Sequence, residues 1–77
     1  MNKDTRKQWM AGQEVLAKAV DAINTLIEIK EQEQERYDNL SEGLQSASDN
    51  ANNGNDVRDS DPEGVLDVLE NLLEVEP

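Results

Sequence analysis

Residues 15–29 have the sequence VLAKAVDAINTLIEI, in which apolar side chains recur every three or four residues. This is the period of an α-helix with one apolar side, so the stretch predicts an amphipathic helix. The apolar stripe is broad and consists of Val15, Leu16, Ala19, Val20, Ala22, Ile23, Leu26, Ile27 and Ile29.

Around this stretch the predicted helix extends from about Thr5 to Tyr37. Asp4 or Thr5 can cap its start, and Gly12 is the only residue inside it with a poor helix propensity. After Ile29 the sequence KEQEQERYD keeps good helix formers but has few apolar side chains, so the helix is expected to continue into solvent.

A corner and a polar segment are predicted to follow the long helix. The sequence DNLSEGLQ, residues 38–45, contains Asn, Ser and Gly, which favour turns, so residues 1–44 form the long helix and its corner. Residues 45–61 are rich in Ser, Asn, Asp and Gly, with Val57 as the only large apolar side chain. Such a segment buries little surface, so it is predicted to be a flexible acidic linker.

Residues 62–77 have the clearest helix start in the chain. Asp61 can cap the helix, Pro62 suits its first position, and the Glu63 carboxylate lies near the positive end of the helix dipole. A second apolar stripe follows, made of Val65, Leu66, Val68, Leu69, Leu72 and Leu73. The fold class predicted is all-α, with a long N-terminal and a short C-terminal helix in a helical hairpin.

The two predicted helices differ in length, which points to a further contact. At 1.5 Å per residue the first is about 45 Å long and the second about 20 Å, so the short helix cannot cover the whole long stripe. Exposed apolar surface of this extent indicates a partner, and we expect a homo-oligomer, in the simplest case a dimeric bundle. The residues predicted at the oligomer or partner interface are Trp9, Leu16, Val20, Ile23, Ile27, Leu66, Leu69 and Leu73.

The spacing of Leu16, Val20, Ile23 and Ile27 is four, three and four residues, as in a helical bundle or a short coiled coil. The alternative is an amphipathic core helix without an oligomer. Trp9 is more often a packing anchor than a recognition residue, although tryptophan is enriched at binding hot spots.

The chain is strongly acidic, with 18 acidic and 7 basic side chains and a formal net charge of −11. Phosphates repel such a surface, so direct nucleic-acid binding is disfavoured and a basic protein partner is expected. The predicted acidic surface consists of Glu31, Glu35, Asp59, Asp67, Glu70 and Glu74.

The sequence contains neither cysteine nor histidine, so no disulfide, cofactor or metal site is expected. No segment has the apolar length of a membrane span or the form of a signal peptide, and we expect a cytoplasmic protein without a membrane partner. Catalysis is not expected, because the carboxylates of so small a chain are nearly all solvated. The run DNANNGNDVRD, residues 49–59, has the composition of a calcium loop but not its spacing, and is interpreted as solvated linker.

The segment ERYDNLSEGLQS, residues 35–46, and the opening MNKDTRK resemble a group of small acidic helical proteins of bacteria, phages and prophages. The matching residues are Tyr37, Asp38, Asn39, Leu40, Glu42, Leu44 and Gln45. Ser41 stands where that group usually has proline, and a polar insert precedes the second helix. The resemblance implies a helical hairpin and a mobile-element origin, and it supplies no activity.

The leading functional hypothesis is a small phage-type accessory protein that binds a basic host or phage protein. One form of this hypothesis is a nucleic-acid mimic that inhibits a defence protein. If the protein is phage-encoded, its compartment is the host cytoplasm. One alternative is a structural or assembly bundle in which acidity only maintains solubility. The other is an antitoxin-like binder whose acidic tail folds on a toxin.

Overall fold

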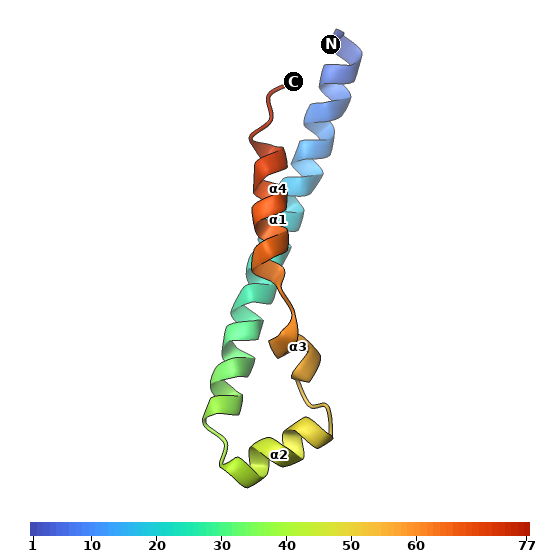
Figure 1. Ribbon diagram of the computed structural model, residues 1–77. Coiled ribbons are helices and arrows are strands. Elements are labelled where there is room, and N and C mark those ends of the chain that lie inside the picture. Colours follow the sequence, from blue (N-terminus) through green and yellow to red (C-terminus); the bar gives the residue numbers. More distant parts are fainter.

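The structure, a computed structural model, describes residues 1–77 and is entirely helical. Its elements are α1 (Lys3–Asp38), α2 (Glu42–Asn50), α3 (Asn55–Asp59) and α4 (Pro62–Leu73). Figure 1 shows a rod in which α4 runs back beside α1, so both termini lie at one end, while α2 and α3 close the other end. The Cα atoms extend over 62 × 17 × 14 Å. The predicted all-α class and the long N-terminal helix are confirmed.

The start of α1 corrects one expectation. The cap is Asn2, whose side-chain oxygen accepts a hydrogen bond from the Thr5 amide at 2.8 Å, whereas Asp4 or Thr5 was expected to cap. The Thr5 hydroxyl donates back to the Asn2 carboxamide oxygen at 2.9 Å, so Thr5 supports the cap from inside the helix. Asp4 instead lies in the first turn, where its carboxylate is close to the positive end of the helix dipole.

The corner after α1 is where the sequence predicts it. Asn39 ends α1, and Ser41 caps α2 by accepting a hydrogen bond from the Leu44 amide at 3.4 Å. Residues 45–61, predicted to be a flexible acidic linker, contain most of α2 and all of α3. Polar contacts take the place of apolar burial: the Ser48 side chain is 7% exposed, and its hydroxyl donates to the carbonyl oxygen of Asn53 at 3.1 Å.

The chain turns between α2 and α3 through two left-handed residues. Asn52 has φ 52° and Gly54 has φ 79°, a region that asparagine and glycine adopt most easily. An added Cβ on Gly54 would overlap the Glu33 carboxylate of α1, so this glycine also allows a close approach of the turn to the long helix.

The start of α4 is as the sequence predicts. The Asp61 carboxylate accepts a hydrogen bond from the Gly64 amide at 3.2 Å, and Pro62 occupies the first turn. The helix ends at Leu73, four residues before the end of the range 62–77 predicted for it.

The hairpin is held along a seam between α1 and α4. Half-buried side chains of both helices meet there, and no hydrophobic residue is fully buried. The seam is closed at its ends by polar contacts: Gln13 donates to the Leu72 and Val75 carbonyls at 3.1 and 2.7 Å, and Lys30 donates to the Ser60 carbonyl at 2.5 Å. None of the helices combines the length and apolar character that a membrane crossing requires.

Candidate interaction surfaces

The structure assigns most of the predicted interface residues to the inside of the hairpin. The half-buried residues of the seam are Leu16, Val20, Ile23 and Ile27 of α1 and Leu66, Leu69 and Leu73 of α4. The sequence predicted that these residues contact another chain, whereas in the structure they lie between α1 and α4 of the same chain. Trp9 is the exception, because it lies beyond the end of α4 and is 36% exposed.

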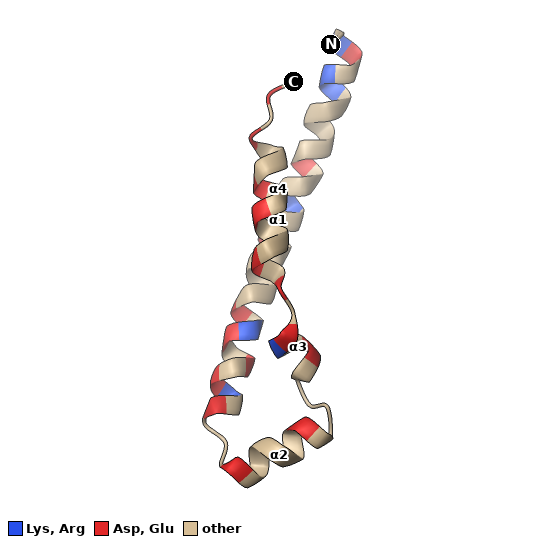
Figure 2. Cartoon of the chain, viewed as in Figure 1, with Lys and Arg blue, Asp and Glu red and all other residues tan.

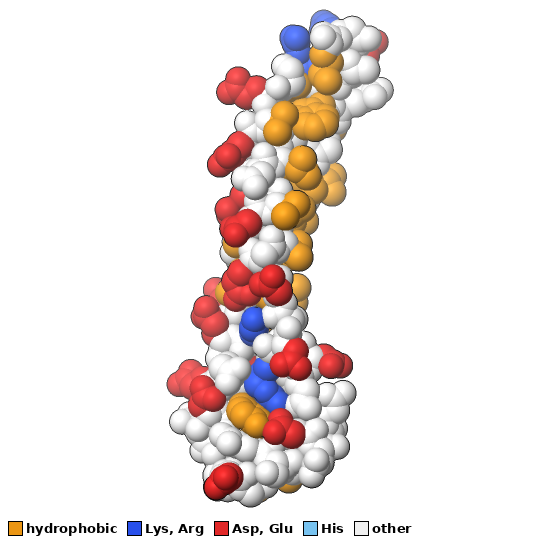
Figure 3. All heavy atoms as spheres, viewed as in Figure 1, with side chains coloured by type: hydrophobic (Ala, Val, Ile, Leu, Met, Phe, Trp, Pro, Cys, Tyr) orange, Lys and Arg blue, Asp and Glu red, His pale blue; other side chains and the backbone are white.

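The exposed apolar side chains lie next to the seam rather than on it. They occupy the positions one residue before the seam positions on each helix, and two antiparallel helices place these positions on the same side of the hairpin. We call this surface the apolar face, and it consists of Val15, Ala22, Leu26 and Ile29 of α1 and Val65, Val68 and Leu72 of α4. Figure 3 shows hydrophobic side chains gathered in a column along the rod.

The apolar face is unusually open for so small a protein. Val15 is 65% exposed, Val68 60% and Leu26 52%, although each is an aliphatic side chain on a well-formed helix. Large contiguous apolar patches on small proteins mark sites where another molecule binds. The face therefore is the first candidate interaction surface.

A groove of about 450 Å³ lies at the α3 end of the apolar face. Its apolar lining comes from three elements: Leu26 and Ile29 of α1, Val57 of α3 and Val65 of α4. Asp56 and Asp61 also line it. An apolar floor with acidic side chains fits an apolar side chain that has a cation beside it.

The opposite side of the hairpin carries a row of carboxylates, which we call the acidic edge. On each helix the acidic residues are exposed and repeat every three, four or seven positions. The acidic edge consists of Glu14, Asp21, Glu28, Glu31 and Glu35 of α1, Glu63, Asp67 and Glu70 of α4, and Glu74, the residue that caps the end of α4. Figures 2 and 3 show acidic side chains along both helices, and in Figure 3 many of them line the edge away from the hydrophobic column.

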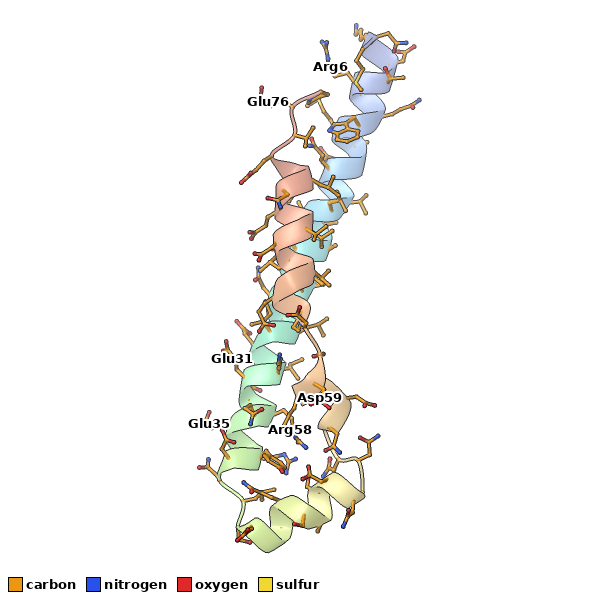
Figure 4. The ribbon with its side chains drawn as sticks, in the orientation of Figure 1. Arg6, Glu31, Glu35, Arg58, Asp59 and Glu76 are labelled. Carbon is orange, nitrogen blue, oxygen red and sulfur yellow. The ribbon has the colours of Figure 1, made fainter.

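Five of the six residues predicted for an acidic surface are part of the acidic edge. The sixth, Asp59, is on α3, and Figure 4 shows it on the other side of the rod from Glu31 and Glu35. The side chain of Lys30 lies 3.7 Å from Glu63 and is the only cation within salt-bridge distance of the acidic edge.

Arg58 organises the end of the rod opposite the termini. Its guanidinium lies 2.8 Å from Glu33 of α1 and 3.3 Å from Asp49 of α2, and it stacks 4.0 Å above the ring centre of Tyr37. The same group also bonds the Asn55 side chain, and only 8% of the Arg58 side chain is exposed. The Arg58 cluster, formed by these five residues, joins α1, α2 and α3.

Two members of the cluster, Glu33 and Tyr37, have shifted pKa values. The hydrogen bond from Arg36 is the main cause that lowers the pKa of Glu33, and the charges of Arg36 and Arg58 add to it. The Tyr37 hydroxyl donates to Asp49 at 2.7 Å, and this hydrogen bond is the main cause that raises the pKa of Tyr37. These shifts belong to a structural contact, because the groups face one another rather than a cavity.

Sequence reasoning missed the Arg58 cluster. The available signal was that Arg58 is the only basic residue after Arg36, placed within the most acidic part of the chain. A single cation among so many carboxylates is well placed to hold several of them together. Its partner Glu33 lies 25 residues away, so no local pattern could identify the pair.

No group of three or more acidic, histidine or cysteine side chains is arranged to hold a metal ion. The features that remain as candidates for function are the apolar face with its groove and the acidic edge. No protein-family model, curated protein or solved structure gives a significant match to this chain.

Proposed function

We propose that this protein acts by binding other proteins rather than by catalysis, and that its acidic edge binds a basic partner. The observation that carries the proposal is the separation of the two surfaces: carboxylates line one side of the hairpin, and exposed apolar side chains line another. A charge that served solubility alone would not require this separation.

The density of charge on the acidic edge favours a partner that also binds nucleic acid. From Glu14 to Glu35 the axial rise is about 31 Å, so nine carboxylates give one charge per about 3.5 Å. One strand of B-DNA carries one phosphate per about 3.4 Å of axis. Averaged over its two rows, the edge carries about the linear charge of a single nucleic-acid strand, which supports a mimic that occupies a cationic nucleic-acid site.

The mobile-element origin implied by the resemblance would make that partner a basic host or phage protein, for example one that defends the host against foreign nucleic acid. Carboxylates on rigid helices are held at fixed spacing, so little conformational entropy is lost when they bind a cationic groove. Inhibition would follow because the nucleic acid and the acidic edge compete for the same site.

The proposal is tested by affinity capture from a host lysate with the immobilised protein, at low and at high salt and with duplex DNA as competitor. Support is a captured basic protein that both salt and DNA displace. The double variant Glu70→Gln/Glu74→Gln should lose this protein, whereas the control Glu42→Gln/Asp59→Asn removes the same charge elsewhere and should keep it. Equal capture by both variants, or capture indifferent to salt, would refute the proposal.

The structural-bundle alternative is favoured by one observation, the open apolar face. It expects a stable oligomer and no captured partner. The antitoxin-like alternative has no comparable support, since it needs a tail that orders on a toxin and α4 already packs along α1. Deletion of residues 45–77 tests it, because toxin binding would be lost while helix association remained.

A further inference from the structure

We infer that the groove between α1, α3 and α4 binds an amphipathic helical segment of a partner protein, with two aliphatic side chains of that segment in the groove and a lysine or arginine beside Asp56. The groove lies on a different surface from the acidic edge. Its occupant is therefore independent of the partner proposed for that edge, and the two surfaces are tested with different variants.

The groove is a recess formed by three helices rather than one flat patch. In Figure 1, α3 lies beside α1 next to the start of α4. The apolar side chains that line the recess are Ile23, Leu26 and Ile29 of α1, Val57 of α3 and Val65 of α4, and its volume is about 450 Å³. Leu26 is 52% exposed and Val65 49%, so about half of each side chain remains to be covered. The recess therefore offers aliphatic surface that the chain itself leaves in contact with solvent.

The length of the groove determines the form of its occupant. From Ile23 to Ile29 the axial rise along α1 is about 9 Å, which is less than two helical turns. Two side chains four residues apart on a helix are separated by about 6 Å along its axis, so such a pair fits the groove. Two folded domains would need about 800 Å² on each side, whereas a groove of this length suits a single segment. A helix that inserts anchors at this spacing is a common occupant of a hydrophobic groove.

The charge at the groove selects a cationic segment. Asp56 and Asp61 are exposed and belong to the lining, which contains no lysine or arginine. Asp61 accepts the capping hydrogen bond from the Gly64 amide, whereas the Asp56 side chain forms no hydrogen bond or ion pair within the chain. Asp56 therefore is a free carboxylate beside exposed aliphatic side chains.

The basic residues that adjoin the groove in the sequence already have partners. Arg58 is held in its cluster, with 8% of its side chain exposed. Lys30 donates to the Ser60 carbonyl and lies 3.7 Å from Glu63. Because neither cation is free to neutralise Asp56, a lysine or arginine of a partner would add an ion pair there, and an acidic residue would be repelled.

The other end of the apolar face has the opposite charge. Lys18 is exposed and lies three residues after Val15 and four before Ala22, so it is on the same side of α1 as these two residues. Its axial distance from Ile29 is about 16 Å, or three helical turns. A cation of the bound segment is therefore favoured at the groove and disfavoured three turns away, which distinguishes a local preference from the general attraction of cations by an acidic chain.

The probe is a synthetic helical peptide of about 14 residues, with leucines spaced alternately by four and three residues and two arginines in its first turn. One comparison peptide has glutamine in place of both arginines. A second has the same composition, rearranged so that its leucines no longer share one side of the helix. Titration of the isotope-labelled protein, followed by its amide chemical shifts in NMR spectra, measures the dissociation constant and locates the site. Shifts should gather at Leu26, Ile29, Val57 and Val65, and the rearranged peptide should cause none.

The apolar contact is tested by the same substitution at two exposed leucines. Leu26→Gln removes an aliphatic side chain from the groove and should raise the dissociation constant about tenfold, because the partner's leucine loses part of its apolar surroundings. Leu44 of α2 is 58% exposed and lies outside the groove, so Leu44→Gln should change the constant less than about twofold. Circular dichroism of both variants shows whether each has folded.

The ion pair is tested by a comparison of the arginine and glutamine peptides. Asp56→Asn should weaken binding of the arginine peptide about threefold and leave the glutamine peptide unchanged, because only the first has an ion pair to lose. Asp67→Asn removes the same charge from the acidic edge and should affect the two peptides equally. The pair of variants separates a contact at the groove from the attraction of any cationic peptide by a chain of net charge −11.

Shifts at the groove that Leu26→Gln weakens, with an arginine preference that Asp56→Asn removes, support the inference. It is overturned by the absence of shifts at about 1 mM peptide, by equal effects of the two leucine variants, or by an arginine preference that persists in Asp56→Asn. A wild-type protein whose apolar face is closed by a second copy, which sedimentation equilibrium would detect, also overturns it. Shifts confined to the acidic edge would overturn it while supporting the proposal for that edge, so the two proposals fail separately.

Discussion

Replacing Arg58 with leucine should release α2 and α3 from the rod while leaving the hairpin of α1 and α4 folded. Arg58 makes two ion pairs and stacks on Tyr37, and its side chain is 8% exposed. Hydrogen bonds to charged groups contribute about 1.5–3 kcal/mol each, but Glu33 and Asp49 can be rehydrated when the partner is lost. The net loss should therefore be about 2–3 kcal/mol.

Segment 42–60 has little else to hold it. Its few large apolar side chains include Leu44 and Val57, which are 58% and 39% exposed, so apolar packing cannot replace the lost cluster. A loss of 2–3 kcal/mol corresponds to an increase of about 30- to 150-fold in the population of the locally open state.

Amide hydrogen exchange measures this directly. The amides of Asn53 and Arg58, which donate to the carbonyls of Ser48 and Gly54, should exchange about 30- to 150-fold faster in Arg58→Leu, whereas the amides of α4 should not change. Arg36→Gln is the matched control, since Arg36 also pairs with Glu33 but is 40% exposed and should have a small effect. Unchanged exchange at residues 42–60, or equal acceleration in α4, would refute the role assigned to Arg58.

Three further predictions concern local features. Gly54→Ala should destabilise the same segment by about 1–2 kcal/mol, because φ is 79° and the new Cβ would overlap Glu33, and hydrogen exchange of residues 42–60 would detect it; an unchanged rate would contradict the assigned strain. The folded-state pKa of Glu33 is lowered, so ionised Glu33 stabilises the folded state at pH values above its unfolded pKa of about 4.5. This stabilisation is lost as the pH falls through the folded-state pKa, so the protection of residues 42–60 from hydrogen exchange should fall in acid. Glu33→Gln should remove this pH dependence. Asp61→Ala should cost the hairpin about 1 kcal/mol in thermal or urea unfolding followed by circular dichroism, because α4 loses its cap, and an unchanged midpoint would be against that assignment.

The two long elements could be predicted from the sequence because each has a continuous helical period. The start of α4 was also predictable, since Asp61 and Pro62 are strong local signals. The two helices at the other end of the rod could not be predicted, because α2 and α3 depend on Arg58 and Glu33, which are far apart in sequence. The composition predicted a flexible linker there, whereas the polar contacts of the Arg58 cluster hold these residues against α1.

The interaction surfaces were predicted in kind but not in position. The stripe around Leu16 and Ile23 is broader than one contact needs, so its pattern alone could not show which half pairs with α4 and which half stays open. The antiparallel packing of α4 decides this, because it covers the line through Ile27 and leaves the adjacent line through Leu26 exposed.

The structural-bundle alternative depends on the claim that the open side of the hairpin binds a second chain, and two alanines of α1 test it. Ala22 lies on the apolar face and Ala17 on the side of the acidic edge, and both are exposed, so Ala22→Asp and Ala17→Asp change charge and helix propensity equally. Sedimentation equilibrium should show that Ala22→Asp raises the dissociation constant of the dimer at least about 100-fold, because two carboxylates become buried in each dimer, while Ala17→Asp changes it less than about threefold. Equal effects of the two substitutions, or a wild-type protein that is monomeric at about 100 μM, would contradict that alternative.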